Sequence, residues 1–249
     1  MSVLTSRDNA KVQHWRKLAE DPRYRRAQKR ALIEGPHLLE AALQHRCKLI
    51  AVLATPDANV DEHLKPVLVS EGVFRSIVDA ETPQGVAAEI AIPDSKPAGA
   101  VRVFLEGVQD PRNVGAIVRT AAAFGVGRVV LDKACADPWS PKALRAGMGG
   151  HFALSIKVKS DLSEQLNAFK GHLLCTVPRD GMPIDEADLS GKVGWIFGGE
   201  GSGLSEQTLR QVPLRVTIPM ASGTESLNVA AAAAICLFET FRRNSGTEP

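Results

Sequence analysis

The second half of this chain alternates between short apolar runs and longer amphipathic stretches, and this alternation restricts the fold more than any other feature. The short runs have the composition of strands that are covered on both faces, as in a parallel sheet. The sequence therefore predicts an α/β fold in which ligands bind beyond the carboxyl ends of the strands. The predicted elements are strands at Val101–Leu105, Arg128–Leu131, Leu173–Val177, Gly194–Phe197 and Leu214–Ile218, and helices at Asn113–Phe124, Leu162–Phe169, Ser205–Gln211 and Leu227–Arg243.

The first 95 residues predict a separate, smaller α/β unit. The stretch Ile92–Ala100 that follows is rich in Pro, Gly and Ser, which is typical of a linker. We therefore expect one domain at residues 1–95 and a second at residues 96–249. The elements predicted in the first domain are polar, basic helices within Asp8–Arg30, an amphipathic helix at Glu34–His45, and strands at Lys48–Ala54, Val67–Ser70 and Val86–Ile92.

Charge is distributed unevenly along a chain that is nearly neutral overall. The formal net charge is +2, from 30 basic and 28 acidic side chains. Residues 1–50 contain eleven Lys and Arg against five Asp and Glu, so this segment carries +6 and the remainder carries −4. A basic end is typical of a protein that binds a polyanion, although a solvated helix face has the same composition. Trp15 and Tyr24 in this segment are candidates either for stacking on exposed bases or for core packing.

The spacing of cysteine and histidine argues against a metal centre and against disulfide bonds. The four cysteines form no C-x-x-C pair, and the six histidines form no close pair of ligands. Four free thiols fit a reducing cytoplasm. The longest apolar run, Val229–Phe238, is ten residues long, against the roughly 20 that a membrane-spanning helix needs. We expect a cytoplasmic protein that binds neither metal nor membrane.

The first of three notable segments that follow predicted strands is Leu105–Arg119. Asn113 is predicted to begin the helix, and Gly115 would let another backbone or a ligand approach closely. An asparagine N-cap with an incidental glycine explains these two residues equally well. Arg119 lies in an otherwise apolar stretch, so the sequence predicts either a buried arginine that needs an anion or an arginine on the surface.

The second segment, Trp195–Leu204, is dense in glycine, which indicates that its backbone approaches something closely. Its G-x-G-x-G spacing departs from the dinucleotide fingerprint. Glu200 would also repel a pyrophosphate. A dinucleotide is therefore disfavoured.

The third segment, Ile218–Ala230, again joins a strand to a helix. Three of its residues are each candidates for the helix N-cap: Ser222, Thr224 and Ser226. Asn228 is predicted inside the start of the helix, where asparagine is unfavourable. The small residues Ala230–Ala234 would let this helix pack tightly against the sheet or another subunit.

Taken together in this order, the three segments resemble the three motifs of the SpoU (TrmH-like) family of RNA 2′-O-ribose methyltransferases, within the SPOUT class. The similarity lies in N-V-G-A-I-V-R-T-A-A-A-F-G, in F-G-G-E-G-S-G-L and in I-P-M-A-S-G-T-E-S-L-N-V-A-A-A-A-A-I-C-L-F-E, and it covers residues 101–243. Residues 7–92, with L-I-E-G-P-H-L-L-E-A-A-L, resemble the ribosomal-protein-like substrate-binding domain that many members carry.

The resemblance implies a C-terminal SPOUT domain with a parallel sheet and a deep trefoil knot. It also implies that S-adenosylmethionine binds in the knot as the cofactor and that the protein is a homodimer. The expected reaction is methylation of a ribose 2′-hydroxyl in RNA, with ribosomal RNA favoured over transfer RNA. The alternatives are a transfer-RNA 2′-O-methyltransferase and a non-catalytic RNA-binding or ribosome assembly factor.

The resemblance also implies roles for individual residues. The catalytic motif residues fall on Asn113, Arg119, Glu200, Ser226 and Asn228, and the cofactor contacts on Thr176, Val177, Gly198, Gly199, Ile218, Met220 and Leu227. Arg119 is implied to act at the ribose 2′-hydroxyl or a neighbouring phosphate. Because arginine does not deprotonate in proteins, we favour phosphate binding or stabilisation of the developing alkoxide over a general base. Gly147 stands where many relatives have serine, which puts a hydroxyl role at that position in doubt.

Overall fold

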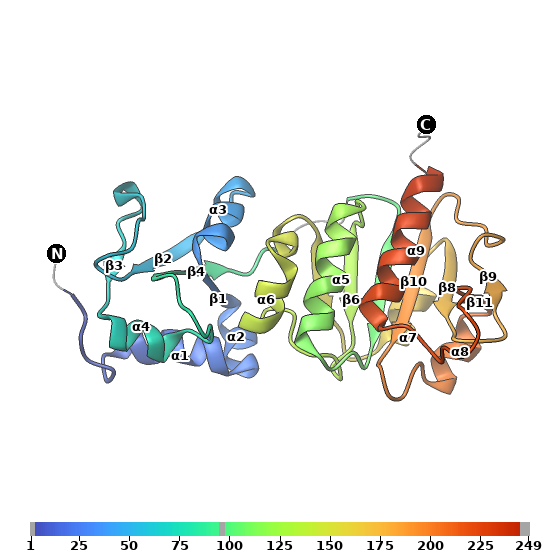
Figure 1. Ribbon diagram of the computed structural model, residues 1–249, viewed down its shortest axis with the longest axis horizontal. Coiled ribbons are helices and arrows are strands. Elements are labelled where there is room, and N and C mark those ends of the chain that lie inside the picture. The colour runs from blue at the N-terminus through green and yellow to red at the C-terminus, as the bar shows by residue number, and fades with distance from the viewer. Residues whose placement is uncertain (1–2, 95–97, 245–249) are drawn as a thin grey trace.

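The chain folds into two parts, each built around its own β-sheet, in this computed structural model (Figure 1). The structure describes residues 3–94 and 98–244. The predicted linker Ile92–Ala100 follows the last strand of the first sheet and precedes the first strand of the second. Residues 95–97, and with them the predicted domain boundary, lie outside the described residues. No helix in the described part of the chain is both long and apolar enough to cross a membrane.

The first part has a four-stranded sheet in the order β1-β4-β2-β3, in which β4 pairs antiparallel with both of its neighbours. Helices α1 and α4 pack on one face, and α3 packs on the other. The elements are α1 (Ala10–Glu20), α2 (Pro22–Gln28), β1 (Arg30–Glu34), α3 (Pro36–Gln44), β2 (Leu49–Ala54), a 3₁₀ turn η1 (Glu62–Leu64), β3 (Val67–Leu68), α4 (Glu71–Ile77) and β4 (Val86–Ala91).

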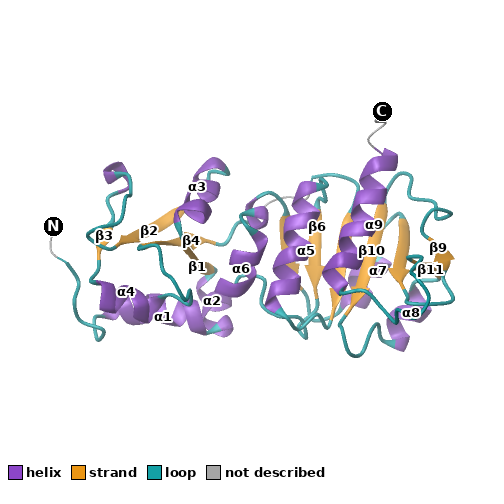
Figure 2. Ribbon diagram, in the orientation of Figure 1, coloured by secondary structure: helices purple, strands orange, loops and turns teal. Residues whose placement is uncertain are grey.

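The second part has a seven-stranded sheet in the order β7-β6-β5-β10-β8-β11-β9, and all of its pairs are parallel, as predicted. Alternate side chains of the central strands point to opposite faces: Val103 and Val129 pack toward α5 and α9, whereas Phe104 and Val130 pack toward α7. Figure 2 shows helices on both sides of the strands.

The elements of the second part follow one another as strand and helix for most of their length. They are β5 (Arg102–Glu106), α5 (Pro111–Ala123), β6 (Arg128–Leu131), α6 (Pro141–Gly147), a 3₁₀ turn η2 (Gly150–Phe152), β7 (Ser155–Val158), α7 (Leu162–Asn167), β8 (His172–Thr176), β9 (Met182–Pro183), β10 (Val193–Gly198), α8 (Glu206–Gln211), β11 (Leu214–Thr217) and α9 (Val229–Asn244).

Several short elements are not predicted from the sequence patterns. β1 lies between two helical patterns, and α4 contains Gly72, so neither element has a clear periodicity. α6 is rich in small residues, and the edge strand β7 includes a serine and a lysine among four residues. The basic helical pattern is also divided in two, because the Asp21 side chain accepts hydrogen bonds from the first backbone amides of α2.

The two parts share a hydrophobic core and are joined by ion pairs. Residues such as Ile33 and Leu144 from the two parts belong to one buried cluster. The Arg25 side chain, 3% exposed, lies 2.7 Å from the Asp137 carboxylate, and it also donates to the Leu18 and Ala19 carbonyls. One cation of the basic N-terminal segment is therefore buried at the contact between the two parts, where its partners are internal, and it is not available to a polyanion.

Of the two aromatic candidates for base stacking, Trp15 packs in the core. Its side chain is 2% exposed, and its Nε1 donates to Oε2 of buried Glu89 at 3.0 Å. Arg30 and His14 contact the other Glu89 oxygen, so the carboxylate is buried with partners on both oxygens. Tyr24 is half-buried, with its hydroxyl 2.8 Å from His14 Nδ1. Stacking of Trp15 on an RNA base is therefore excluded in this fold.

Candidate functional site

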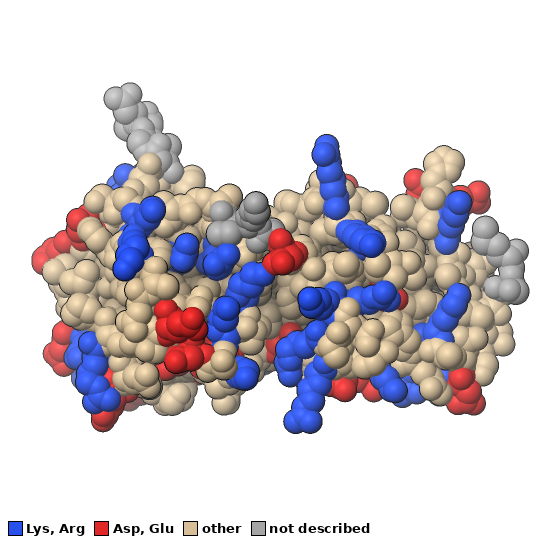
Figure 3. Space-filling model, turned by 180° about the vertical axis from the view of Figure 1, so that it is seen from behind, with Lys and Arg blue, Asp and Glu red and all other residues tan. Residues whose placement is uncertain are grey.

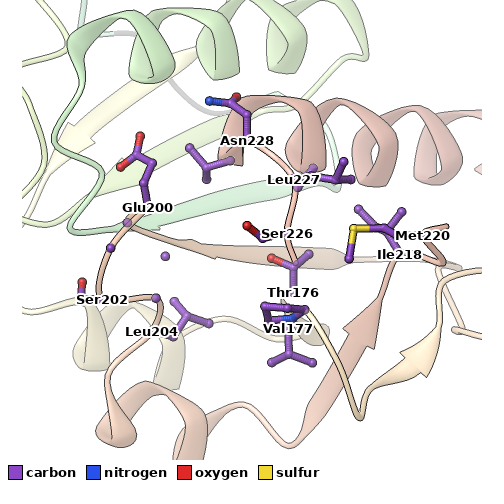
Figure 4. Close-up of a pocket in the computed structure, with 17 residues that line it drawn as sticks. Thr176, Val177, Glu200, Ser202, Leu204, Ile218, Met220, Ser226, Leu227 and Asn228 are labelled. Atoms are coloured by element: carbon purple, nitrogen blue, oxygen red, sulfur yellow. The ribbon is translucent and has the colours of Figure 1, made fainter. Parts of the chain in front are cut away.

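A cavity of about 480 Å³ opens at the carboxyl ends of β8, β10 and β11, where ligands of parallel sheets bind. Its walls come from the loops after these three strands and from the start of α9 (Figure 4). The seven residues predicted to contact a cofactor all line this cavity: Thr176, Val177, Gly198, Gly199, Ile218, Met220 and Leu227. Three of the five predicted catalytic residues line it as well: Glu200, Ser226 and Asn228.

Three of the four glycines at the end of β10 and in the loop after it are required by close packing or by backbone conformation, whereas Gly201 has open space around it. A Cβ on Gly199 would lie 2.9 Å from the Gly107 carbonyl carbon and would overlap with its oxygen. A Cβ on Gly198 would lie 2.7 Å from the Leu204 nitrogen. Gly203 has a φ of 62°, which L-residues rarely adopt. The close approach predicted for this segment is therefore present: the backbone at Gly198 and Gly199 lies against other backbone of the same chain.

Glu106 holds the far end of this loop and is a residue that the sequence analysis does not single out. Its carboxylate accepts hydrogen bonds from the Ser205 backbone amide at 3.0 Å, from the Ser205 hydroxyl at 2.8 Å and from the Thr208 hydroxyl at 3.0 Å. Ser205 caps α8 directly after the glycine loop. The sequence contains one feature that could have identified Glu106: it is an acidic residue at the carboxyl end of an apolar strand, next to the predicted site.

Asn113, Glu200 and Asn228 come together at the rim of the cavity from three different segments. The Asn113 side-chain amide donates to Glu200, and Asn228 Nδ2 donates to Asn113 Oδ1 at 3.2 Å. The sequence predicts that Asn113 begins its helix, and this prediction is wrong. Asp110 caps α5, and Pro111 is the first residue of the helix. The Asn113 side chain is therefore free to contact the other two residues.

Asn228 is the cap of α9 and does not lie within the helix. Its side-chain oxygen accepts from the Ala230 amide at 2.9 Å and from the Ala231 amide at 3.3 Å, and α9 begins at Val229. None of the predicted caps Ser222, Thr224 and Ser226 holds this position. An asparagine at the cap removes the propensity problem, and it leaves Nδ2 available for Asn113. Ser226 lies on the inner wall of the cavity (Figure 4).

Arg119 is not brought into the cavity of its own chain. Its side chain is exposed on α5, on the face opposite the buried residues Val114, Ile117 and Val118, so the alternative of a surface arginine holds. No ion pair or hydrogen bond of its guanidinium is found within the described residues. An exposed, unpaired guanidinium on the helix that carries Asn113 is available to a ligand from outside the chain.

The cavity combines apolar walls with polar groups and carries little charge. Among its described lining residues Glu200 is the one charged side chain, and the walls include Val177, Leu204, Ile218 and Leu227. The exposed residues Gly201 and Gly203 of the loop supply backbone hydrogen-bond donors and acceptors beside these apolar walls. Such a cavity suits a flat, neutral ring together with a cationic group near the carboxylate.

Gly147 is explained by a neighbouring histidine. A Cβ on Gly147 would overlap with Cε1 and Nδ1 of His151, whose side chain is 1% exposed and contacts Trp139 with ring centroids 5.4 Å apart. Helices α5 and α6 also approach closely here, since a Cβ on Gly115 would lie 2.7 Å from Ala146 Cβ. A hydroxyl role at position 147 is therefore absent from this chain, and the position serves packing.

Acidification is expected to destabilise the protein through His151. Burial lowers the pKa of this imidazole to about 4, from an ordinary value of 6.5. Because the unfolded chain binds the proton first, the free energy of unfolding should fall as pH decreases from about 6.5 to about 4, by roughly 1.4 kcal/mol per unit for this residue alone. Urea unfolding of the native protein and of His151→Gln at several pH values measures this contribution. An identical pH dependence of the two proteins would contradict it.

Family models match both parts of the chain. The SpoU rRNA Methylase family matches residues 100–238, and the MRM3-like substrate binding domain matches residues 9–88. The chain is 34% identical over 246 residues to the 23S rRNA (guanosine(2553)-2′-O)-methyltransferase RlmP of Bacillus subtilis, covering 96% of this chain and 98% of that protein. It is 36% identical over 149 residues to the 23S rRNA (guanosine-2′-O-)-methyltransferase RlmB of Nitrosomonas europaea, covering 59% of this chain and 57% of that protein.

A solved structure matches both parts of the chain together. It is the AdoMet-bound rRNA methyltransferase from Sinorhizobium meliloti, with a TM-score of 0.84 and 28% identity over 97% of this chain and 98% of that one. The two family models and the full-length relative agree with the motifs read from the sequence. With its parallel sheet, its MRM3-like first part and these similarities, the chain belongs to the SpoU rRNA methylase family.

Proposed function

We propose that this protein transfers the methyl group of S-adenosylmethionine to a ribose 2′-hydroxyl of ribosomal RNA. The observation that carries the proposal is the apolar, glycine-walled cavity with Glu200 at its rim, hydrogen-bonded to Asn113 beside Asn228. The apolar walls suit adenine, and a carboxylate complements a sulfonium cation. The cavity volume of about 480 Å³ lies within the usual range for small-molecule sites.

The residues of this chain would act mainly by positioning. When bound, S-adenosylmethionine supplies an activated methyl group, so the reaction needs in-line alignment of the 2′-oxygen and no metal. Asn113, Glu200 and Asn228 offer amide and carboxylate groups that can fix the ribose and the cofactor at the rim of the cavity. Ser226 adds a hydroxyl on the inner wall. Arg119 would act from outside the cavity of its own chain, on a phosphate or on the developing alkoxide.

Two measurements test the proposed function. Isothermal titration of the purified protein with S-adenosylmethionine should give saturable binding. Mass-spectrometric mapping should then find one ribose methylation missing from the large-subunit rRNA of cells that lack the gene. Loss of a methyl group from transfer RNA alone would reassign the substrate. Absence of cofactor binding and an unchanged RNA would leave only the assembly-factor alternative.

We propose further that residues 1–95 form the RNA-binding domain and residues 96–249 the catalytic domain of a cytoplasmic enzyme. The match of an MRM3-like substrate binding domain to residues 9–88 supports this division, as does the excess of cations in residues 1–50. The trefoil knot implied by the motifs stays a prediction about the region that forms the cavity. In the proposed enzyme the first domain binds rRNA through phosphates, so its affinity should decrease with salt.

A homodimer is proposed on the basis of the exposed face of α9. Ile235, Phe238 and Phe241 are 39%, 51% and 42% exposed, and they recur at helical spacing. Phe124 at the end of α5 extends this apolar face, with its ring centroid 5.8 Å from that of Phe238 and 5.6 Å from that of Phe241. A contiguous apolar face of this kind is typical of a protein–protein interface. A second copy is the expected partner, because two such faces are complementary to each other.

Phe238→Asp is expected to convert the proposed dimer into a monomer. A carboxylate at the centre of the apolar face would be buried without a partner in the dimer, whereas it stays hydrated in the monomer. Light scattering after size-exclusion chromatography should show half the native mass. Leu43→Asp on α3 is the matched control, because Leu43 is 43% exposed on a helix of the first part. A monomeric native protein, or a dimeric Phe238→Asp, would contradict the proposal.

A further inference from the structure

The amino-terminal edge of the seven-stranded sheet carries a row of cations that the proposed reaction at the opposite edge does not use. Arg102 and Arg128 are the first residues of β5 and β6 and pair in register. Lys157 lies on the neighbouring strand β7, opposite Val130 and two residues in from this edge, on the same face of the sheet as Arg128. Lys192 directly precedes β10 on the other side. Lys170 lies two residues before β8, in a segment that packs against the backbone of Lys192. We call these five residues the cationic edge.

Within the described residues, the two arginines of the cationic edge have no carboxylate at ion-pair distance. The Arg128 Nε donates to the Ser155 hydroxyl at 3.3 Å, and the Arg102 guanidinium lies 5.2 Å from the centre of the Phe169 ring. Burial and, to a lesser extent, the neighbouring Arg102 lower the pKa of Arg128, and the more distant Asp94 carboxylate opposes them only in part. Like charges on directly paired strand positions repel each other. A bound anion would relieve this repulsion.

The anion that fits the cationic edge is longer than a single phosphate. The five cations belong to or precede the adjacent strands β7, β6, β5, β10 and β8, so the row spans roughly 20 Å at about 4.8 Å per strand. Asp94 pairs with Lys157 and partly offsets the positive charge of this region. It also interacts electrostatically with Lys29, which is the C-cap of α2 in the first part, so the positive region continues from the sheet to the first part. Figure 3, the view from behind, shows Lys and Arg side chains on both parts of the molecule, with Asp and Glu side chains between them.

We infer that the cationic edge binds the phosphate backbone of the RNA substrate at nucleotides remote from the methylated ribose. This inference rests on the proposed function. Strands of four to six residues separate the cationic edge from the carboxyl edge, which corresponds to roughly 13 to 20 Å along the sheet. In this arrangement the RNA extends from the cavity to the amino-terminal ends of the strands of the second part, and from there toward the basic first part. These contacts are sequence-independent, because they involve phosphates and no base edges.

The test is a salt titration of the affinity for an unmodified large-subunit rRNA transcript. Two variants each remove two charges: Arg102→Gln with Arg128→Gln at partly exposed positions, and Lys170→Gln with Lys192→Gln at fully exposed ones. Each variant should bind the transcript roughly tenfold more weakly near 0.1 M salt, with a salt slope reduced by about 1.4. The matched control is Arg210→Gln with Arg242→Gln, which removes two exposed charges from the second part that already pair with Glu206 and Glu239 on their own helices.

The affinity for S-adenosylmethionine separates this inference from the proposed function. All three variants should bind the cofactor as the native protein does, because none of the substituted residues lines the cavity. If the two variants of the cationic edge bind RNA with the affinity and salt slope of the control, the inference is wrong. The proposed function would still hold in that case, provided that the variants methylate the RNA at the native rate. A native protein that binds neither the cofactor nor the transcript would overturn both.

Discussion

Arg119→Ala is expected to reduce methyl transfer to rRNA by about 10²- to 10³-fold, the usual effect of removing one group that stabilises developing charge. The affinity for S-adenosylmethionine should stay unchanged, because Arg119 does not line the cavity. Its guanidinium is exposed and has no partner within the described residues, so the substitution removes no internal contact. Single-turnover transfer of a radiolabelled methyl group measures the rate, and isothermal titration measures the cofactor affinity.

Arg112→Ala is the matched control for Arg119. Arg112 lies seven residues earlier on the same face of α5 and is also exposed, but its guanidinium pairs with Asp110 at 2.8 Å. A solvated ion pair of this kind contributes little, so less than about a threefold change in rate is expected. Arg119→Lys should recover only part of the rate, since lysine lacks the planar fork of donors. If Arg119→Ala methylates rRNA at the native rate, the catalytic role assigned to this residue is wrong.

Gly147→Ser is expected to destabilise the fold by about 1 to 3 kcal/mol, as overpacking of a buried site does. The added Cβ would overlap with the imidazole of His151, which is itself fixed between α6 and the Trp139 ring. Neither ring nor helix can move freely, because α5 and α6 already touch at Gly115 and Ala146. The midpoint of urea unfolding measures the loss.

A second substitution distinguishes this steric mechanism from a general loss of helix packing. In Gly147→Ser combined with His151→Ala, the space vacated by the imidazole accommodates the serine side chain. The double variant should therefore be more stable than the sum of the two single effects predicts, with a coupling of about 1 kcal/mol or more. Strictly additive effects would show that His151 does not explain the glycine at position 147.

The parallel sheet and its chemistry were accessible from the sequence because they depend on local patterns. Continuous apolar runs separated by helical stretches specify buried parallel strands, and the glycine-rich segments directly follow those strands. The carboxyl ends of parallel strands meet at one edge of a sheet, so loops that are far apart in sequence converge there. For this reason the predicted cofactor contacts all line one cavity.

The local patterns did not specify the exact ends of α5 and α9. Asp110 and Asn228 cap these helices, and each cap shifts a helix start by two residues from its predicted position. These shifts matter because they place the side chains of Asn113 and Asn228 where they contact each other. The short elements β1, α6 and β7 have too few residues for a periodicity to be recognised, and contacts with neighbouring elements stabilise them.

The sequence by itself determined the class of fold, the three segments that form the site and the family to which they belong, since each is encoded within a contiguous stretch. Only the tertiary structure decided which charged residues are available to a ligand. Arg25 is buried against Asp137, whereas Arg119 is exposed and unpaired within the described residues. The row of cations on neighbouring strands is also invisible in the sequence, because the order of strands in the sheet differs from their order along the chain. Burial and strand order are properties of the packed chain, and no local pattern of residues encodes them.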